Sequence, residues 1–236
     1  MDGIQRAAAL YGSDGRFVSF SGAGLSAESG IATFRDPQTG HWAKYDPMKL
    51  ASPEGFAEDP GLVIDWYNHR RKVLAAARPN RAHRALASRP DFVHATQNVD
   101  HLLEAAGARD VAHLHGRIDA DRCQAACGFV EDIAINDPPD LRPCPDCGAL
   151  LRPTVVWFGE ALPTGAWETA LSAARSADAM LVIGTSAAIY PAAGIVDEAR
   201  ATGATVVEVN IEPSISSADL SLIGPAAELV PRILIP

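Results

Sequence analysis

The four cysteines of the chain have a spacing that suits one kind of chemistry. Three residues separate Cys123 from Cys127, two separate Cys144 from Cys147, and the two pairs lie close together in the sequence. Two such pairs can supply four thiolates to one tetrahedral zinc ion. Two disulfides are the alternative, but they suit secreted proteins, and the N-terminus lacks a signal-peptide pattern. A site closed by four thiolates has no open position for substrate, so we expect a structural zinc.

A glycine pattern forms a second candidate site. Gly22, Gly24 and Ala27 give the spacing G-x-G-x-x-A directly after the apolar run 16–20. Glycines at this spacing allow a tight turn and the close approach of a pyrophosphate, and we expect a helix to follow and to point its N–H groups at the phosphates. A plain strand–helix turn would give the same pattern. A dehydrogenase would show a ribose-binding acid about 20 residues further on, whereas here the glycines continue into a polar loop that contains Arg35.

The elements that must position these residues alternate between strands and helices. Short runs rich in β-formers predict strands at 16–20, 91–96, 111–114, 154–158, 179–183 and 205–209. Amphipathic or well-capped stretches predict helices at 3–11, 62–77, 79–87, 99–106, 164–176 and 192–202. We expect only short helical turns in 37–60, and 226–235 has no clear type. This alternation predicts an α/β fold with a doubly wound, Rossmann-like parallel sheet.

Polar clusters follow five of the predicted strands. They are Gly22–Gly24, Gln97–Asp100, His115, Gly184–Ser186 and Asn210–Glu212. Ligands of such sheets bind at the carboxyl ends of the strands, so we expect the five clusters to line one crevice.

The composition is that of an ordinary globular protein. The 236 residues are 47% hydrophobic and 21% charged, with a formal net charge of −9. A binder of nucleic-acid backbones usually has a basic face, so this class is disfavoured. The chain has no apolar run near the ~20 residues of a membrane span, and we expect a cytoplasmic protein that does not bind membranes.

Taken together, these residues resemble the sirtuin family, the NAD-dependent protein lysine deacylases. The resemblance runs from about residue 15 to the end of the chain. Its motifs are Gly22-Ala-Gly-Leu-Ser-Ala-Glu-Ser-Gly30, Thr33-Phe-Arg35, Thr96-Gln-Asn-Val-Asp-His101, Leu114-His-Gly116, the four cysteines, Val155-Val-Trp-Phe-Gly-Glu160, Gly184-Thr-Ser186 and Asn210-Ile-Glu212. The chain is most similar to the class III branch of bacterial deacylases and desuccinylases. The resemblance implies one catalytic domain over 1–236, made of a Rossmann-like core (1–36, 79–120, 151–236), a helical insertion (37–78) and a zinc module (121–150).

The resemblance also implies roles for individual residues. His115 would be the catalytic base, with Asn98 assisting. NAD would be bound by Gly22, Ala23, Gly24, Glu28, Phe34, Arg35, Gln97, Asn98, Asp100, Gly184, Thr185, Ser186, Asn210, Ile211, Glu212 and Ala226. The acyl-lysine peptide would add as a strand beside Val156, Trp157, Phe158, Gly159 and Glu160.

The implied reaction consumes NAD and transfers no hydride. The acyl-lysine oxygen attacks the ribose carbon as nicotinamide leaves, and His115 takes a proton from a ribose hydroxyl. Histidine suits this role because its usual pKa lies near neutrality. The deprotonated ribose oxygen then attacks the amidate carbon, and water completes the reaction. The products would be nicotinamide, free lysine and O-acyl-ADP-ribose.

Tyr67 and Arg70 bear on the choice of acyl group. They are three residues apart on a predicted helix and therefore share a face. Taken alone, Arg70 would be read as part of a solvated basic face with Arg71 and Lys72. In class III sirtuins, however, a Tyr-x-x-Arg pair binds a carboxylate at the end of the acyl chain, which a guanidinium can hold bidentately. The resemblance thus implies a preference for succinyl- or malonyl-lysine, with some acetyl-lysine activity.

Other functions remain open at this point. The chain could be a mono-ADP-ribosyltransferase or a deacetylase without preference for acidic acyl groups. A dehydrogenase is disfavoured by the missing ribose acid, and a non-catalytic ADP-ribose-binding module by the presence of His115 and Asn98. We expect a monomer whose partners are acylated proteins.

Overall fold

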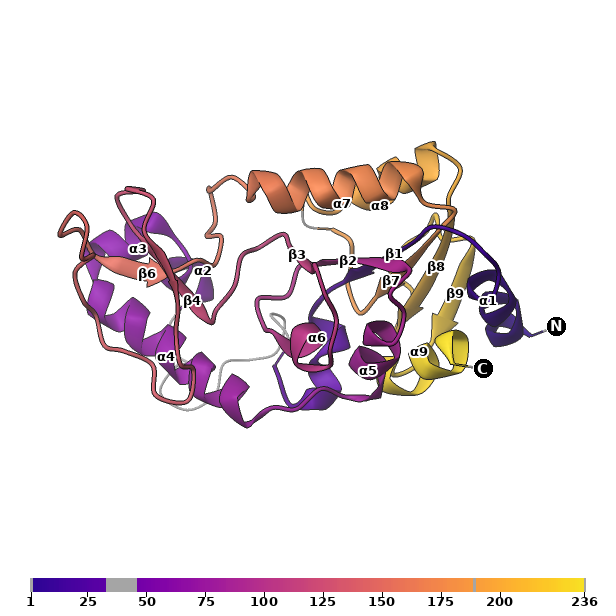
Figure 1. The fold of residues 1–236 in the computed structure, drawn as a ribbon, viewed down its shortest axis with the longest axis horizontal. Coiled ribbons are helices and arrows are strands. Elements are labelled where there is room, and N and C mark those ends of the chain that lie inside the picture. The colour runs from indigo at the N-terminus through magenta and orange to yellow at the C-terminus, as the bar shows by residue number, and fades with distance from the viewer. Residues whose placement is uncertain (1, 33–45, 189, 236) are drawn as a thin grey trace. The chain divides into compact units, whose positions relative to one another are not determined.

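The structure is a computed structural model, and it describes residues 2–32, 46–188 and 190–235 (Figure 1). The chain divides into two compact units. Unit 1 comprises Met1–Phe34, Arg78–Leu114 and Pro163–Pro236, and unit 2 comprises Arg35–Ala77 and His115–Leu162. Phe34 and Arg35, two of the expected NAD-binding residues, lie outside the described residues.

Unit 1 is built on a six-stranded parallel sheet. Its strand order is β3-β2-β1-β7-β8-β9. The strands are β1 (Phe17–Ser21), β2 (Phe92–Thr96), β3 (Ala112–His113), β7 (Ala179–Ile183), β8 (Thr205–Asn210) and β9 (Leu220–Ile223). Every residue of β1 and β7 is buried, as expected for central strands of a sheet that is covered on both faces. The strand order changes direction between β1 and β7, and this point is where such sheets bind ligands. The predicted doubly wound sheet is confirmed.

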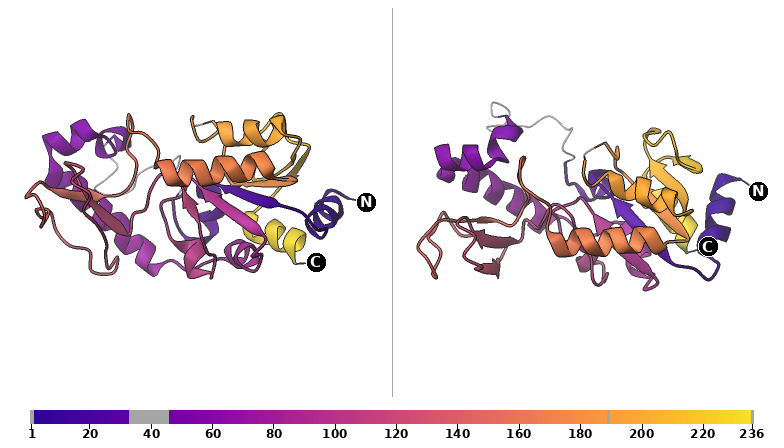
Figure 2. Two further views of the ribbon diagram at one scale, coloured as in Figure 1. Left: turned by 45° about the horizontal axis from the view of Figure 1, so that its top comes forward. Right: turned by 90° about the horizontal axis from the view of Figure 1, so that it is seen from above.

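Helices cover both faces of this sheet. On one face lie α7 (Thr164–Ser176) and α8 (Gly194–Ala201), which pack together (Figures 1 and 2). On the other face lie α1 (Gly3–Tyr11), α5 (Arg81–Ala87), α6 (Leu102–Ala105) and α9 (Ala226–Leu234). The tail 226–235, which the sequence left unassigned, forms α9 because most of its apolar residues are buried in the core of unit 1.

Unit 2 combines helices with a small antiparallel sheet. The helices are α2 (Pro47–Leu50), α3 (Pro53–Glu58) and α4 (Pro60–Ala76), and the sheet has the order β5-β4-β6. Its strands are β4 (Ala120–Cys123), β5 (Val130–Asp132) and β6 (Leu151–Pro153). Helix α4 begins with Pro60 in its first turn, and the Asp59 side chain accepts the Leu62 N–H at 2.9 Å.

The structure corrects two predicted elements near the candidate site. The helix expected directly after the glycine pattern is instead two 3₁₀ turns, η1 (Ala23–Leu25) and η2 (Ala27–Ser29), and Gly30 ends them at φ +83°. The strand expected at 154–158 is irregular chain. The Thr154 N–H still donates to the Ala120 carbonyl of β4. The N–H groups of the next three bonded residues donate to partners outside the sheets, namely the His115 carbonyl, the Glu160 carboxylate and the Ala51 carbonyl.

Three smaller differences concern the antiparallel sheet of unit 2, the edge strand β9 and the start of α6. The sequence did not predict the antiparallel sheet of unit 2, nor the edge strand β9. Helix α6 begins at Leu102, later than expected, because Asp100 Oδ1 accepts the Leu102 N–H at 3.0 Å and ends the preceding loop.

In the part of the chain that the structure describes, no helix has the length and apolarity needed to cross a membrane.

Candidate functional site

The two glycine patterns of unit 1 pack directly against each other. The Gly24 N–H donates to the Gly184 carbonyl at 2.9 Å. A Cβ at Gly24 would lie 2.6 Å from the Gly184 Cα, and Gly184 itself has φ +58°. A Cβ at Gly22 would lie 2.7 Å from the Thr185 Cβ. Glycine is therefore needed at these positions to bring the two loops together at the carboxyl ends of β1 and β7.

A hydrogen-bond network extends this edge to β2 and β8. Gln97 Nε2 donates to Thr185 Oγ1 at 3.1 Å, and Asn210 Nδ2 donates to the Thr185 carbonyl at 3.0 Å. The Ser214 hydroxyl donates to Glu208, whose carboxylate is fully buried in β8 and also accepts the Ser221 hydroxyl. These bonds fix the loop after Asn210 beside Thr185. Predicted residues on three strand ends therefore meet, as the sequence indicated.

A buried polar cluster lies beneath the η1 and η2 turns. The Ser26 hydroxyl donates to Asp100 Oδ2 at 2.9 Å and accepts from Asn98 Nδ2 at 3.2 Å. The His83 Nε2 lies 3.4 Å from the same hydroxyl. Burial raises the pKa of Asp100 and lowers the pKa of His83 to about 4. A neutral imidazole and a carboxyl group thus contact the same hydroxyl in a buried site.

Asn98 and Asp100 of this cluster were predicted from the sequence, whereas Ser26 and His83 were not. Ser26 lies inside the glycine motif, but its partners Asn98 and Asp100 are distant in the sequence. His83 also takes part in the capping box at the start of α5, where the Asn80 N–H donates to His83 Nδ1 with 3.3 Å between the two nitrogen atoms. This structural role gave no sign of a contact with Ser26.

The buried histidines predict a loss of stability in mild acid. Burial lowers the pKa of both His83 and His94 from 6.5 to about 4. The unfolded chain therefore binds protons between these values while the folded chain does not, so this stability is complete above pH 6.5 and is lost as the pH falls toward 4. We expect each histidine to lower the free energy of unfolding by about 1–2 kcal/mol between pH 7.5 and pH 5.

Urea denaturation at the two pH values measures this loss. The matched variant is His94→Gln, since glutamine can keep the 2.8 Å bond that His94 Nδ1 makes with Ser19 Oγ. It should reduce the pH dependence. An unchanged difference between pH 7.5 and pH 5 in this variant would contradict the assignment.

The other predicted NAD-binding residues of unit 1 differ in their exposure and in their contacts. Glu28 Oε2 accepts the Ala227 N–H at 2.7 Å, next to Ala226 at the start of α9. The Ile211 side chain is 76% exposed although it is apolar. Ala23 lies in η1, Ser186 directly follows Thr185, and Glu212 is exposed after β8.

In unit 2, His115 lies on a backbone that is tightly fixed. Its carbonyl accepts the Val156 N–H at 2.9 Å. Gly116 has φ +70°, and a Cβ there would lie 2.2 Å from the Thr154 carbonyl oxygen. The His115 side chain is half-buried. This environment combines a rigid main chain with a side chain that solvent can reach.

The predicted acyl- and peptide-binding residues form one connected group in unit 2. The Trp157 indole donates to the Tyr67 hydroxyl at 2.9 Å, and the Arg70 guanidinium carbon lies 5.8 Å from the centre of the Tyr67 ring. The Glu160 carboxylate accepts the Trp157 N–H at 2.8 Å and pairs with Arg152 and Arg122. Its charge is therefore already balanced within the unit. Phe158 and Gly159, which lie between Trp157 and Glu160 in the sequence, are exposed, and Val156 is half-buried.

The four cysteines meet at one point of unit 2. Their sulfur atoms all lie within 4.8 Å of one another, with Cys123 3.4 Å from Cys147 and Cys127 3.6 Å from Cys144. A disulfide would require about 2.05 Å. Zinc–sulfur bonds of about 2.3 Å place tetrahedral sulfur atoms roughly 3.8 Å apart, so the donor set fits zinc.

The Sir2 family model matches residues 22–191, well over half of the chain. The chain belongs to the Sir2 family. It is 47% identical over 233 residues to NAD-dependent protein deacylase 1 of Pseudomonas aeruginosa, with 93% of each chain covered. It is 45% identical to the NAD-dependent protein deacylase of Mycobacterium tuberculosis, over 93% of this chain and 96% of that protein.

Solved structures agree with this Sir2-family assignment. A Sir2 homologue in complex with NAD superimposes with a TM-score of 0.89 at 38% identity, over 99% of this chain and 93% of the other. A Sir2 protein in complex with a p53 peptide and NAD⁺ gives 0.85 at 28% identity, over 99% and 97% of the two chains.

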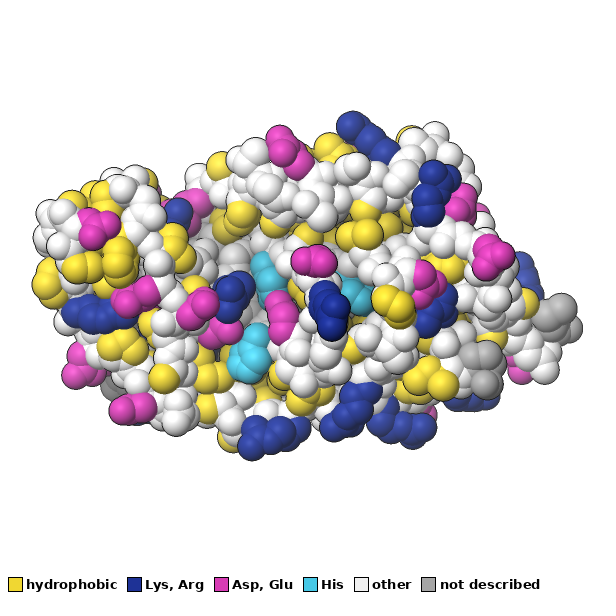
Figure 3. Space-filling view, viewed as in Figure 1, with side chains coloured by type: hydrophobic (Ala, Val, Ile, Leu, Met, Phe, Trp, Pro, Cys, Tyr) yellow, Lys and Arg dark blue, Asp and Glu magenta, His cyan; other side chains and the backbone are white. Residues whose placement is uncertain are grey.

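The surface of this Sir2-family chain carries mixed charge. On the face drawn in Figure 3, acidic side chains are interspersed with lysine and arginine and do not leave one wide basic area.

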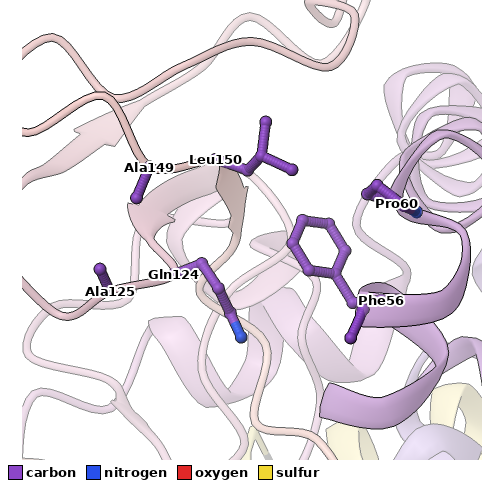
Figure 4. Close-up of a pocket in the computed structure, with 7 residues that line it drawn as sticks. Phe56, Pro60, Gln124, Ala125, Ala149 and Leu150 are labelled. Carbon is purple, nitrogen blue, oxygen red and sulfur yellow. The ribbon is translucent and has the colours of Figure 1, made fainter.

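Unit 2 has a small apolar pocket of about 280 Å³ between α3 and the cysteine loops, where the Phe56 ring and Pro60 face Leu150 and Gln124 (Figure 4). None of the predicted site residues lines this pocket.

Proposed function

We propose that the chain is an NAD-dependent protein deacylase that prefers acyl-lysines ending in a carboxylate. The deacylase activity rests on membership of the Sir2 family and on relatives named NAD-dependent protein deacylase that match over nearly their whole length. The acyl preference rests on one observation, the adjacent Tyr67 and Arg70 side chains of α4. The protein substrates are acylated proteins or peptides.

The residues of unit 1 fit NAD. The glycine loops bring backbone N–H groups close together at the strand ends, where phosphates bind in this fold. The network of Thr185 and Asn210 would hold the adenosine half, and Asn98 and Asp100 would face the nicotinamide half. Bound NAD supplies an electrophilic ribose carbon and is consumed as a co-substrate.

The residues of unit 2 would bind the acyl-lysine and move the proton. The irregular segment 155–160 would accept the substrate peptide along its backbone. His115 would take a proton from a ribose hydroxyl through its imidazole, at a position held by the rigid turn of Gly116. The zinc would keep the β5-β4-β6 sheet folded and take no part in the reaction.

The Tyr67–Arg70 pair suits a carboxylate. A guanidinium offers paired donors to a carboxylate, and a phenol adds one more. Succinyl- and malonyl-lysine carry such a group, and acetyl-lysine does not. Acetyl-lysine would therefore be processed with lower efficiency.

Replacing Arg70 by methionine tests the proposal. We expect Arg70→Met to lower kcat/KM for a succinyl-lysine peptide by about 100-fold relative to an acetyl-lysine peptide, since hydrogen bonds to a charged group are each worth about 1.5–3 kcal/mol. Products are measured by mass spectrometry with NAD and peptides of one sequence.

The matched control is Lys72→Met, which removes an exposed cation from the same helix. It should leave the succinyl-to-acetyl ratio as in the wild type. Equal loss of both activities in Arg70→Met would refute the acyl preference. Accumulation of ADP-ribosylated protein without release of acyl groups would refute deacylation.

A further inference from the structure

Trp157 and Tyr67 share a buried hydrogen bond that has a fixed direction. The two side chains are 2% and 0% exposed, and their polar atoms lie 2.9 Å apart. An indole N–H can only donate, so the Tyr67 oxygen must accept. Burial raises the pKa of Tyr67 to about 12, opposed in part by the charge of Arg70, so the phenol keeps its hydrogen at neutral pH.

Within the described part of the chain, no acceptor receives the hydroxyl hydrogen of Tyr67. Among the residues that the structure describes, the bond from Trp157 is the one hydrogen bond of the Tyr67 hydroxyl. A buried donor without a partner is destabilising, because it has lost its hydrogen bonds to water and gained none in return. Such a donor beside a guanidinium favours a ligand that brings an anionic acceptor.

The direction of the Trp157 indole is set by the fold. Its backbone N–H donates to Glu160 at 2.8 Å, and the Arg152 guanidinium lies over its ring, 3.8 Å from the ring centre. The Phe56 ring packs against it with centres 5.3 Å apart. The Tyr67 ring lies nearly parallel to it at 30°. These contacts hold the indole N–H on the Tyr67 oxygen before any substrate arrives.

We propose that Trp157 is a positioning residue for acyl selectivity. By donating to the Tyr67 oxygen, it turns the hydroxyl hydrogen away from itself and makes Tyr67 a donor. Tyr67 and Arg70 then present donors alone, which suits a carboxylate and gives no advantage to a methyl group. This inference rests on the proposed function and adds to it a residue outside the Tyr-x-x-Arg pair.

A double-mutant cycle tests this role. The variants are Trp157→Phe, which keeps an aromatic ring but removes the N–H, then Tyr67→Phe, and both together. The substrates are a succinyl-lysine peptide and a butyryl-lysine peptide of one sequence. The butyryl group has a methyl group where the succinyl group has its terminal carboxylate. The readout is the ratio of kcat/KM for succinyl over butyryl.

We expect Trp157→Phe to lower this ratio about tenfold, in line with one hydrogen bond to a charged group. In the Tyr67→Phe background it should lower the ratio less than twofold, because the oxygen that it orients is gone. A structural role alone would lower both activities together and leave the ratio unchanged. The proposal is wrong if Trp157→Phe changes the ratio less than twofold, or if the two effects multiply.

A second measurement does not depend on how well the Trp157 variant folds. In the ¹⁵N-labelled wild-type protein, the indole N–H resonance of Trp157 is assigned by its change in Tyr67→Phe. It should shift when the succinyl peptide is added and shift much less with the butyryl peptide. Equal shifts with both peptides would overturn the inference.

The outcomes separate this inference from the proposed function. A wild-type protein with no preference for succinyl over butyryl refutes the proposed acyl preference. A preference that Arg70→Met removes and Trp157→Phe leaves intact refutes the role of Trp157 alone.

Discussion

Replacing His115 by alanine is expected to lower kcat/KM for NAD-dependent deacylation about a thousandfold. A positioned general base contributes roughly 10²–10⁴-fold, and His115 is the residue to which the family resemblance assigns this role. The variant should fold, because it keeps two backbone features of this position, the bond from the Val156 N–H to the His115 carbonyl and the turn at Gly116. Nicotinamide and deacylated peptide are measured by mass spectrometry.

His69→Ala is the matched control, since His69 is an exposed histidine of the same unit. Added imidazole should restore part of the activity of His115→Ala, because it can replace the missing base. It would restore no activity if the variant had lost activity by misfolding. Activity of His115→Ala within tenfold of the wild type, with normal thermal stability, would contradict the role of His115 as base.

Replacing Cys144 by serine is expected to remove the zinc and to unfold the β5-β4-β6 sheet. The buried apolar cluster of this sheet is small, with Cys123, Cys144 and Leu151 at its centre. A structural zinc contributes more folding free energy than a core of this size can replace. We expect the zinc content to fall from one ion per chain to below a third, and the melting temperature to fall by about 10 °C or more.

Metal analysis and thermal unfolding measure these changes. Ala125→Ser, which places a serine between the first two cysteines without removing a thiolate, is the control and should retain the zinc. One zinc per chain with an unchanged melting temperature in Cys144→Ser would show that this thiolate is not a ligand.

The sequence predicted those parts of the fold that depend on local patterns. The run 179–183 is apolar and short, and it forms β7 with the same bounds. The cysteine spacing predicted a cluster because the ligands of each pair are neighbours in the chain, and their sulfur atoms do meet. Gly24 and Gly184 were found because close contact between backbones requires residues without a side chain.

The remaining features depend on contacts between distant residues. The apolar run 154–158 has the pattern of a strand, but its Val156 and Phe158 N–H groups bond to His115 and Ala51 instead of to a neighbouring strand. Ser26 reaches Asp100 across 74 positions of sequence, so its role in the buried cluster could not be read from its own neighbourhood. Trp157 was predicted as part of a peptide-binding strand, whereas its bond to Tyr67 spans 90 positions.

The order of strands in unit 1 has a consequence for the synthesis of the chain. Strand β1 pairs with β2 on one side and with β7 on the other, with Phe20 opposite Ala95 and Val182. During synthesis, residues 22–91 separate β1 from β2, and β7 emerges only after the whole of unit 2. The backbone edge of β1 that pairs with β7 must therefore stay unpaired while residues 22–178 are translated. Such an edge is prone to pair with other nascent chains, so we expect early folding of unit 1 to be the step at which this protein most needs a chaperone.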